Sequence, residues 1–433
     1  MLEKIFKIRE RNTSIKQEFI GGMVTFLTMA YIIFVNPNIL SVTGMDKDAL
    51  ITVTCLAGII GSLLVGLWAN VPFAMAPGMG LNAMFAYTLV KADGATWQQA
   101  LGVVFLSGIV FIIISILGLR HKIVEAIPES LRVAIGSGIG LFIAFIGFKN
   151  MGLIVANPAT LVGIGKFTPA VVIGLASLLL TVLLEHYRVK GSILIGVLFA
   201  TFAGYFFDPN LLIPSEITSV PPSIMPIFGK LEIISVLKVS FIAPIFSFLF
   251  VNLFDSIGTA IACSMEAGLV EKDGKMPHVK KVLEADAVAT ALSGVLGTSS
   301  TVTYIESAAG IANGARTGLS SIFTALFFLL AMFFAPIIGV VPAYATAPAL
   351  ILVGIYMAKH LVKIDFTELY IGVPVFLTLI LMPLTYSIST GIAYGFVSYV
   401  TLCVLTKNTE KIHPFMWIIG AFSLIEIISA QAL

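Results

Sequence analysis

Long apolar runs separated by short polar loops fill most of this chain of 433 residues. A helix needs about 20 apolar residues to cross the hydrocarbon core of a bilayer. The runs predict fourteen such spans, seven on each side of a proline-rich stretch at 208–230. Those of the first half are 18–40, 49–69, 74–90, 97–119, 131–148, 169–184 and 192–207. Those of the second half are 236–262, 281–296, 300–314, 319–340, 345–358, 366–383 and 388–405.

An odd number of spans in each half gives the two halves opposite orientations, which is the inverted-repeat plan of secondary transporters. A weak echo supports this plan, since GSILIG at 191–196 resembles YSISTG at 386–391. The fold class predicted is an all-α membrane protein of two inverted seven-helix repeats. Its parts would be a first repeat (1–207), an external linker (208–230), a second repeat (231–406) and a tail (407–433). The sequence leaves open whether the apolar segment 415–430 of the tail crosses the membrane.

Positive charges predict the orientation, because cytoplasmic loops carry an excess of Lys and Arg. The N-terminal segment and the loops after even-numbered spans hold Lys4, Lys7, Arg9, Arg11, Lys16, Arg120, Lys122, Arg188, Lys190, Lys272, Lys275, Lys280, Arg316, Lys359, Lys363, Lys407 and Lys411. Loops after odd-numbered spans are nearly free of them. We therefore expect a multi-pass protein of the cell inner (plasma) membrane with a cytoplasmic N-terminus.

Composition agrees with a lipid-covered protein. The chain is 58% hydrophobic and 11% charged, whereas an average soluble domain has about 25% charged residues. A net charge of +2 gives no basic field for nucleic acid, so the expected partners are the bilayer and a small molecule. Cys55, Cys263 and Cys403 lie far apart in apolar runs, without the spacing of a metal site or a disulfide framework. We expect no cofactor and no metal.

Two spans are poor membrane helices and occupy corresponding places in the two halves. Residues 71–82 contain two prolines and two glycines, which interrupt a helix, and 298–310 begin with a β-branched stretch that favours extended backbone. Paired broken segments indicate a binding site near the middle of the membrane. Lipid cannot satisfy their free backbone groups, so these groups must face protein or a cavity. A purely structural re-entrant role is the alternative.

Three acidic residues lie inside predicted spans, where an idle carboxylate costs about 3 kcal/mol. Asp255 is in the middle of span eight, and Glu306 opens the short helix of span ten. Neither has a basic partner in its own span. Asp286 lies near the start of span nine, where a structural pair with Lys280 or Lys281 is the alternative to a functional role. Burial favours a protonated carboxyl group, so Asp255, Glu306 and Asp286 are candidates for proton coupling.

The same segments predict the cargo. Carboxylates accept hydrogen bonds from N–H groups, and backbone N–H groups at the short helices donate to a carbonyl. This combination suits a flat, uncharged heterocycle and repels an anion. Asn82 adds an amide, for which a helix–helix hydrogen bond is the alternative. We expect Tyr304 and Ala308, which flank Glu306, to line the substrate site.

Four motifs together resemble a known family. They are GGMVTFLTMAY at 21–31, APGMGLNA at 76–83, LFDSIGT at 253–259 and TVTYIESAAG at 301–310. Over its whole length the chain resembles the hypoxanthine/guanine/adenine permease branch of the nucleobase–cation symporter-2 superfamily.

The resemblance implies a core domain of spans 1–4 and 8–11, a gate domain of spans 5–7 and 12–14, and short strands in spans three and ten. It implies purine recognition and proton coupling by Asp255 and Glu306, with roles for Asn82, Thr28 and Asp286. It also implies a homodimer. At Asn252 the chain departs from the carboxylate that the resemblance leads us to expect in some relatives, so the resemblance fixes the general function but not the cation stoichiometry or the base preference.

The predicted function is secondary active import of hypoxanthine, guanine and/or adenine by proton symport; sodium is the less favoured coupling ion. The alternatives are a uracil or xanthine permease and a sulfate-type anion carrier of the same fold. An intramembrane enzyme would need a His-Glu metal motif or an activated serine, which the spans do not offer. A channel fits the composition, but two acids at broken helices favour alternating access.

Overall fold

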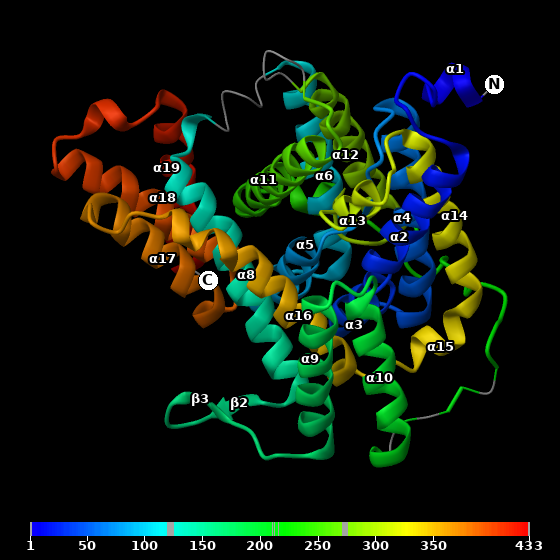
Figure 1. The fold of residues 1–433 in the computed structure, drawn as a ribbon. Coiled ribbons are helices and arrows are strands. Elements are labelled where there is room, and N and C mark those ends of the chain that lie inside the picture. Colours follow the sequence, from blue (N-terminus) through cyan, green and yellow to red (C-terminus); the bar gives the residue numbers. More distant parts are fainter. Residues whose placement is uncertain are drawn as a thin grey trace.

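The computed structural model describes residues 2–118, 125–209, 211, 213–214, 216–270 and 276–431, and these are mainly helical (Figure 1). The α-helices of the first half are α1 (Leu2–Phe6), α2 (Ile15–Met29), α3 (Ile32–Leu40), α4 (Lys47–Trp68), α5 (Met79–Ala83), α6 (Trp97–Ile116), α8 (Glu129–Met151), α9 (Pro169–His186) and α10 (Ser192–Phe207). Those of the second half are α11 (Ile242–Glu266), α12 (Pro277–Leu296), α13 (Ser307–Ala312), α14 (Gly318–Ala331), α15 (Ala335–Gly339), α16 (Ala343–Ala358), α17 (Leu369–Thr385), α18 (Ile388–Leu405) and α19 (Pro414–Gln431).

A π-helix, η2 (Met84–Ala92), continues α5, and short 3-10 turns are η1 (Ser41–Thr43), η3 (Ile234–Val236), η4 (Val239–Phe241), η5 (Met332–Phe334), η6 (Lys359–Lys363) and η7 (Thr409–Lys411). The strands are β1 (Met75–Pro77), β2 (Ile154–Asn157), β3 (Leu161–Ile164) and β4 (Thr301–Thr303). Strand β1 pairs with β4, and β2 pairs with β3 in a hairpin that the apolar pattern did not predict.

The protein is a multi-pass membrane protein. In the described part of the chain, nine helical stretches are long and apolar enough to cross a bilayer: Ile15–Thr43, Lys47–Trp68, Trp97–Ile116, Glu129–Met151, Pro169–His186, Ile242–Glu266, Gly318–Gly339, Ala343–Val362 and Ile388–Leu405. Shorter apolar helices are Ser192–Phe207, Leu369–Thr385 and Pro414–Ile425. Four of the charges used to predict orientation, Arg120, Lys122, Lys272 and Lys275, lie outside the described residues.

The helices form two bundles. In the first, called here the crossing bundle, α4 packs against α14 and α12 packs against α6, so each half of the chain contributes one helix to each pair. Figure 1 shows this mixing, since the blue helices α2 and α4 lie beside the yellow helix α14. In the second, the flanking bundle, α8 packs against α16 and α17, α9 packs against α10, and α19 covers α18.

The first predicted span is two helices and not one. Helix α2 ends at Met29 and α3 begins at Ile32. Pro37 lies inside α3 and has no N–H to donate to the carbonyl one turn earlier. At the start of α3, the N–H groups of Ile33 and Phe34 donate to carbonyls three residues earlier, as in a 3-10 helix. The break makes Tyr31 the N-cap residue of α3, from which its side chain reaches Glu306.

The linker after α10 is held against the crossing bundle. The Thr52 hydroxyl donates to the carbonyl of Pro222 at 2.9 Å, and the Ser219 N–H donates to the carbonyl of Phe333 at 2.9 Å. The Gly229 N–H reaches the carbonyl of Val295 at 2.8 Å. The described part of the linker therefore joins helices of both halves.

Candidate functional site at the crossing of two broken segments

The two interrupted spans meet in a short antiparallel strand pair. Met75 lies opposite Thr303, and Pro77 lies opposite Thr301. Beyond the paired strands, the Tyr304 N–H donates to the carbonyl of Ala74 at 2.9 Å, and the Gly78 N–H donates to the carbonyl of Ser300 at 3.0 Å. All six strand residues are buried. Because each segment satisfies the backbone of the other, non-helical chain is tolerated at membrane depth.

Tyr304 and Ser307 fasten the ends of the strand pair. The Tyr304 hydroxyl donates to the carbonyl of Pro77 at 2.6 Å. Ser307 donates to the carbonyl of Tyr304 at 2.7 Å and accepts from the Ala74 N–H at 3.0 Å. Tyr304 was expected to line the substrate site, and the structure shows its hydroxyl bonded within the protein; substrate contact by its ring stays a prediction.

Glu306 lies where the chain leaves β4 and turns into α13, for which it is the N-cap residue. Its side chain is partly exposed, and its Oε1 accepts a hydrogen bond from the Tyr31 hydroxyl. The Thr28 hydroxyl donates mainly to its own helix, at 2.9 Å to the carbonyls of Val24 and Thr25, and reaches the Glu306 carbonyl at 3.5 Å. The structure therefore brings Thr28, Tyr31 and Glu306 together.

Asp255 projects from the middle of α11 near the same point. Its side chain is partly exposed, and nothing within the described residues donates a hydrogen bond to its carboxylate. Asp255 and Glu306 are close enough for their charges to interact. Two neighbouring carboxylates resist being ionised together, so one proton shared between them, or N–H donors from a ligand, would relieve the repulsion.

Asp286 lies behind the strand pair, not at the membrane surface. It is fully buried in α12, and its Oδ2 accepts hydrogen bonds from the Ser256 hydroxyl and, at 3.2 Å, from the Thr303 N–H. Its Oδ1 has no partner among the described residues. The alternative considered from the sequence, a pair with Lys280 or Lys281, is not what the structure shows, and Asp286 instead supports β4.

A buried polar chain continues from Asp286 toward the other side of β4. The Asn252 amide donates to the Thr290 hydroxyl at 2.6 Å and accepts from Ser256 at 3.3 Å. Thr290 donates to the carbonyl of Thr301 at 3.2 Å. A carboxylate at position 252 could not donate to Thr290 unless it were protonated, so this support of β4 depends on the amide of Asn252.

Asn82 and Ala308 belong to the short helices on either side of the strand pair. Asn82, in α5, is fully buried, and its Oδ1 accepts a hydrogen bond from Ser299 in the opposite segment. Its Nδ2 has no partner in the described part of the chain. Ala308 is partly exposed in the first turn of α13. The amide of Asn82 therefore holds the two broken segments together, and its NH2 group remains an unpaired donor within the described residues.

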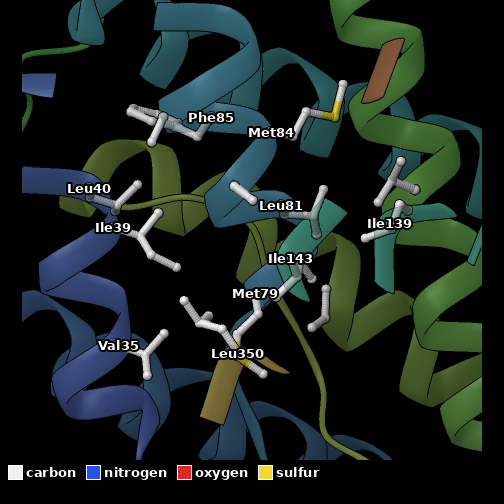
Figure 2. Close-up of a cluster of buried hydrophobic side chains, with 14 of the residues drawn as sticks. Val35, Ile39, Leu40, Met79, Leu81, Met84, Phe85, Ile139, Ile143 and Leu350 are labelled. Atoms are coloured by element: carbon white, nitrogen blue, oxygen red, sulfur yellow. The ribbon is translucent and has the colours of Figure 1, made fainter. Parts of the chain in front are cut away.

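The flanking bundle closes one side of the crossing with apolar side chains. Figure 2 shows Val35 and Ile39 of α3 and Met79 and Leu81 of α5 facing side chains of α8 and α16. The facing side chains in this cluster are Ile139, Ile143 and Leu350. Gly80 permits the close approach, because a Cβ added there would lie 2.8 Å from Cγ2 of Ile139.

Polar groups of the flanking bundle approach Glu306 from another side. Glu185, at the end of α9, accepts a hydrogen bond from Ser192 at the start of α10 and another from the Tyr356 hydroxyl of α16. Glu185 and Tyr356 are both near enough to interact with the charge of Glu306. The site thus has walls from both bundles.

Sequence comparison decides the family. The chain matches the Permease family over residues 16–394. The chain belongs to this family. It is 41% identical to the adenine permease AdeP of Escherichia coli over 433 residues, covering 100% of this chain and 97% of that protein. It is 43% identical to the guanine/hypoxanthine permease PbuG of Bacillus subtilis over 428 residues, covering 96% and 97% of the two chains.

These relatives confirm the resemblance to the purine permease branch and the prediction of a transporter rather than an enzyme. Solved structures show the fold alone. The transmembrane domain of the cyanobacterial bicarbonate transporter BicA superposes with a TM-score of 0.65 at 16% identity, over 87% of this permease and 97% of that chain. SLC26A9 superposes with a TM-score of 0.66 at 12% identity, over 94% and 67%.

Proposed function

We propose that this permease imports purine nucleobases, namely hypoxanthine, guanine and/or adenine, by proton symport. The observation that carries the proposal is the meeting of Asp255 and Glu306 beside the β1–β4 crossing, in a chain whose relatives are an adenine permease and a guanine/hypoxanthine permease. Two partly exposed acids at membrane depth provide both acceptors for purine N–H groups and a place for a proton.

Each site residue has a proposed role. Glu306 and Asp255 accept hydrogen bonds from the base and carry the coupling proton, and Asp286 transmits changes at Asp255 to β4 through Ser256. Asn82 offers its free Nδ2–H to the base. The pocket walls would include Thr28, Tyr304 and Ala308. Protons rather than sodium are proposed as the coupling ion because carboxyl groups alone suffice to bind them.

The proposed architecture is fourteen spans in two inverted repeats. The spans would be the nine long apolar stretches, the short helices α10 and α17, the charged helix α12 and the two broken segments. In these repeats α4 is equivalent to α12, and α6 is equivalent to α14. The symmetry therefore requires α12 to pack against α6 in the same way that α4 packs against α14, and both pairs are in contact.

We propose that the two bundles are the core and gate domains. In this proposal the crossing bundle is the core and the flanking bundle is the gate, and access alternates as one moves against the other. The proposed limits are 1–207 and 231–406 for the repeats, 208–230 for an external linker and 407–433 for the tail. A cytoplasmic N-terminus, the plasma membrane and a homodimer complete the proposal.

The alternative cargoes make distinct predictions. A uracil or xanthine permease would keep the fold and the acids, whereas an anion carrier would be hindered by two carboxylates at the site. The likeness to BicA and SLC26A9 concerns the fold and gives no support to an anion cargo.

The test is uptake of labelled hypoxanthine by vesicles containing the purified protein, with and without an inward proton gradient. Unlabelled guanine, adenine, xanthine, uracil and sulfate serve as competitors, and Glu306→Gln protein at equal membrane content is the control. Gradient-driven uptake that purines block supports the proposal. Uptake of uracil or sulfate in place of purines would overturn it.

A further inference from the structure

Two loops of the flanking bundle have the same unusual backbone. Tyr386, just before α18, has φ 56° and ψ 25°, and Gly191, just before α10, has φ 75° and ψ 22°. Both are left-handed, which suits glycine and is costly for tyrosine. Both precede a serine, within the two sequences GSILIG and YSISTG that resemble each other. The loops are therefore equivalent positions of the two halves in both sequence and conformation.

Each loop touches one of the broken segments. The Thr88 hydroxyl of η2 donates to the carbonyl of Tyr386 at 3.3 Å and accepts from the Ile388 N–H at 3.2 Å. In the other half, the Lys190 ammonium donates to Oδ1 of Asn313 at the end of α13. Segment η2 follows β1 and α13 follows β4.

The two contacts lie on opposite sides of the strand pair. Because β1 and β4 run antiparallel, the chain leaves them at opposite ends, toward Thr88 in one case and toward Asn313 in the other. A contact between the bundles on each side is the arrangement that alternating access needs.

The Tyr386 contact is much the larger. Across the bundles, the ring of Tyr386 meets the ring of Tyr87 at a centroid distance of 5.9 Å, and within the flanking bundle the α8 residues Phe142 and Phe145 pack on the same ring at 5.6 and 5.5 Å. The Lys149 ammonium lies 4.9 Å from the centre of the Tyr386 ring, in cation–π geometry. Gly191 has no ring, and on its side Lys190 supplies the hydrogen bond to Asn313 while Gly191 lies close to the backbone of Leu27.

The same contact contains features that favour its release. The Tyr386 hydroxyl is buried and finds no hydrogen-bond partner within the described residues, and its backbone is left-handed. The partner segment η2 is a π-helix, a form that is rare and often marks functional positions. Packing against Tyr87 and the hydrogen bonds of Thr88 hold the contact, while the Tyr386 hydroxyl gains hydrogen-bond partners from water if it opens.

We propose that Tyr386 and Gly191 mark two latches, one on each side of the site, that open in alternation during transport. The Tyr386 latch comprises Tyr386, Lys149, Tyr87 and Thr88, and the Gly191 latch comprises Lys190, Gly191 and Asn313. Tyr386 is a positioning residue that holds the gate domain closed on one side. This inference rests on the proposed transport function.

A disulfide across the Tyr386 latch tests the idea directly. In Thr88→Cys/Ile388→Cys protein, the two positions are joined by a hydrogen bond, so their backbones are near enough for cross-linking. Cys55, Cys263 and Cys403 are buried, and the single variants Thr88→Cys and Ile388→Cys serve as controls. Oxidation should reduce hypoxanthine uptake by the double variant at least tenfold, and reduction should restore it.

Uptake by the wild-type protein tests the proposed transport function separately. Failure of that function can therefore be distinguished from failure of the latch proposal. Undiminished uptake by the cross-linked protein would overturn the latch, because that contact would not need to open. Failure of the two cysteines to cross-link would also contradict it, because the segments would not meet.

A second measurement compares how accessible the site is from each side of the membrane. A reporter cysteine at Ala308 is labelled with a membrane-impermeant maleimide added to either side of oriented vesicles. Tyr386→Ala should raise labelling about tenfold from the side of the α17–α18 loop and lower it from the other, whereas Tyr386→Phe, which keeps the ring, should not. Equal labelling of all variants from both sides would overturn the proposal.

Discussion

The Tyr31 hydroxyl donates a hydrogen bond to the carboxylate of Glu306, linking the break in the first span to the start of the short helix α13. The two residues are 275 positions apart in the chain. Tyr31 is fully buried, whereas Glu306 is partly exposed. The hydrogen bond therefore orients Glu306 and leaves part of its carboxyl group free for a ligand.

Replacing Tyr31 by phenylalanine removes this hydrogen bond with little change in shape. A hydrogen bond to a charged group contributes about 1.5–3 kcal/mol, so we expect uptake efficiency, Vmax/KM, to fall roughly tenfold to a hundredfold. Concentration-dependent uptake of labelled adenine and hypoxanthine measures it. Tyr304→Phe, which loses its bond to the Pro77 carbonyl, is the matched control and should reduce thermal stability more than substrate affinity. An unchanged KM and Vmax in Tyr31→Phe would remove Tyr31 from the site.

Asp255→Asn separates coupling from binding. An amide keeps the size of the side chain and cannot release a proton, so uphill accumulation should be lost while exchange of base down its gradient persists. Accumulation and counterflow in the same vesicles give the two quantities. Equal loss of both activities in Asp255→Asn would assign Asp255 to binding alone.

Much of this arrangement follows from local sequence. Apolar runs predict the long helices because a bilayer demands length and hydrophobicity. Pro72 and Pro77 with nearby glycines predict the first interruption, and the β-branched stretch at 301–303 predicts the second; both contain strands in the structure. Asp255 and Glu306 stand out because acids are costly in such runs.

The partners of the site residues could not be predicted in this way, because they depend on contacts between segments that are distant in the sequence. The neighbours of Tyr31 in the sequence do not indicate its role, because its partner Glu306, at the start of α13, is 275 positions away. Nearness in sequence was also misleading for Asp286, because Lys280 and Lys281 are six and five positions away. At about 100° per residue, neither lies on the face of α12 that carries Asp286, and that face is turned toward Ser256 and Thr303.

Asp286→Ala should destabilise the protein more than Asp286→Asn does. Alanine leaves the Thr303 N–H buried without an acceptor, at about 1–3 kcal/mol, and leaves Ser256 only its longer hydrogen bond to Oδ1 of Asn252 at 3.3 Å, whereas asparagine retains an oxygen. A thiol-reactive dye that reports exposure of the buried cysteines on heating measures the unfolding temperature.

Ser256→Ala removes one donor and leaves the carboxylate paired with Thr303, so its unfolding temperature should lie between those of wild type and Asp286→Ala. If Asp286→Ala unfolded at the wild-type temperature, Asp286 would have no role in supporting β4.

The close approach of α5 to α8 predicts a suppressor pair. Gly80→Ala places a Cβ 2.8 Å from Cγ2 of Ile139, which forces the two bundles apart and should lower uptake several-fold. Ile139→Ala removes the offending methyl group, so the double variant should recover part of the lost activity even though Ile139→Ala alone weakens the apolar cluster. Gly136→Ala is the control, because an added Cβ there meets no atom within 4 Å. Labelled-base uptake at matched expression measures all four variants. If the two losses simply add in the double variant, the contact between Gly80 and Ile139 does not set how closely the bundles approach during transport.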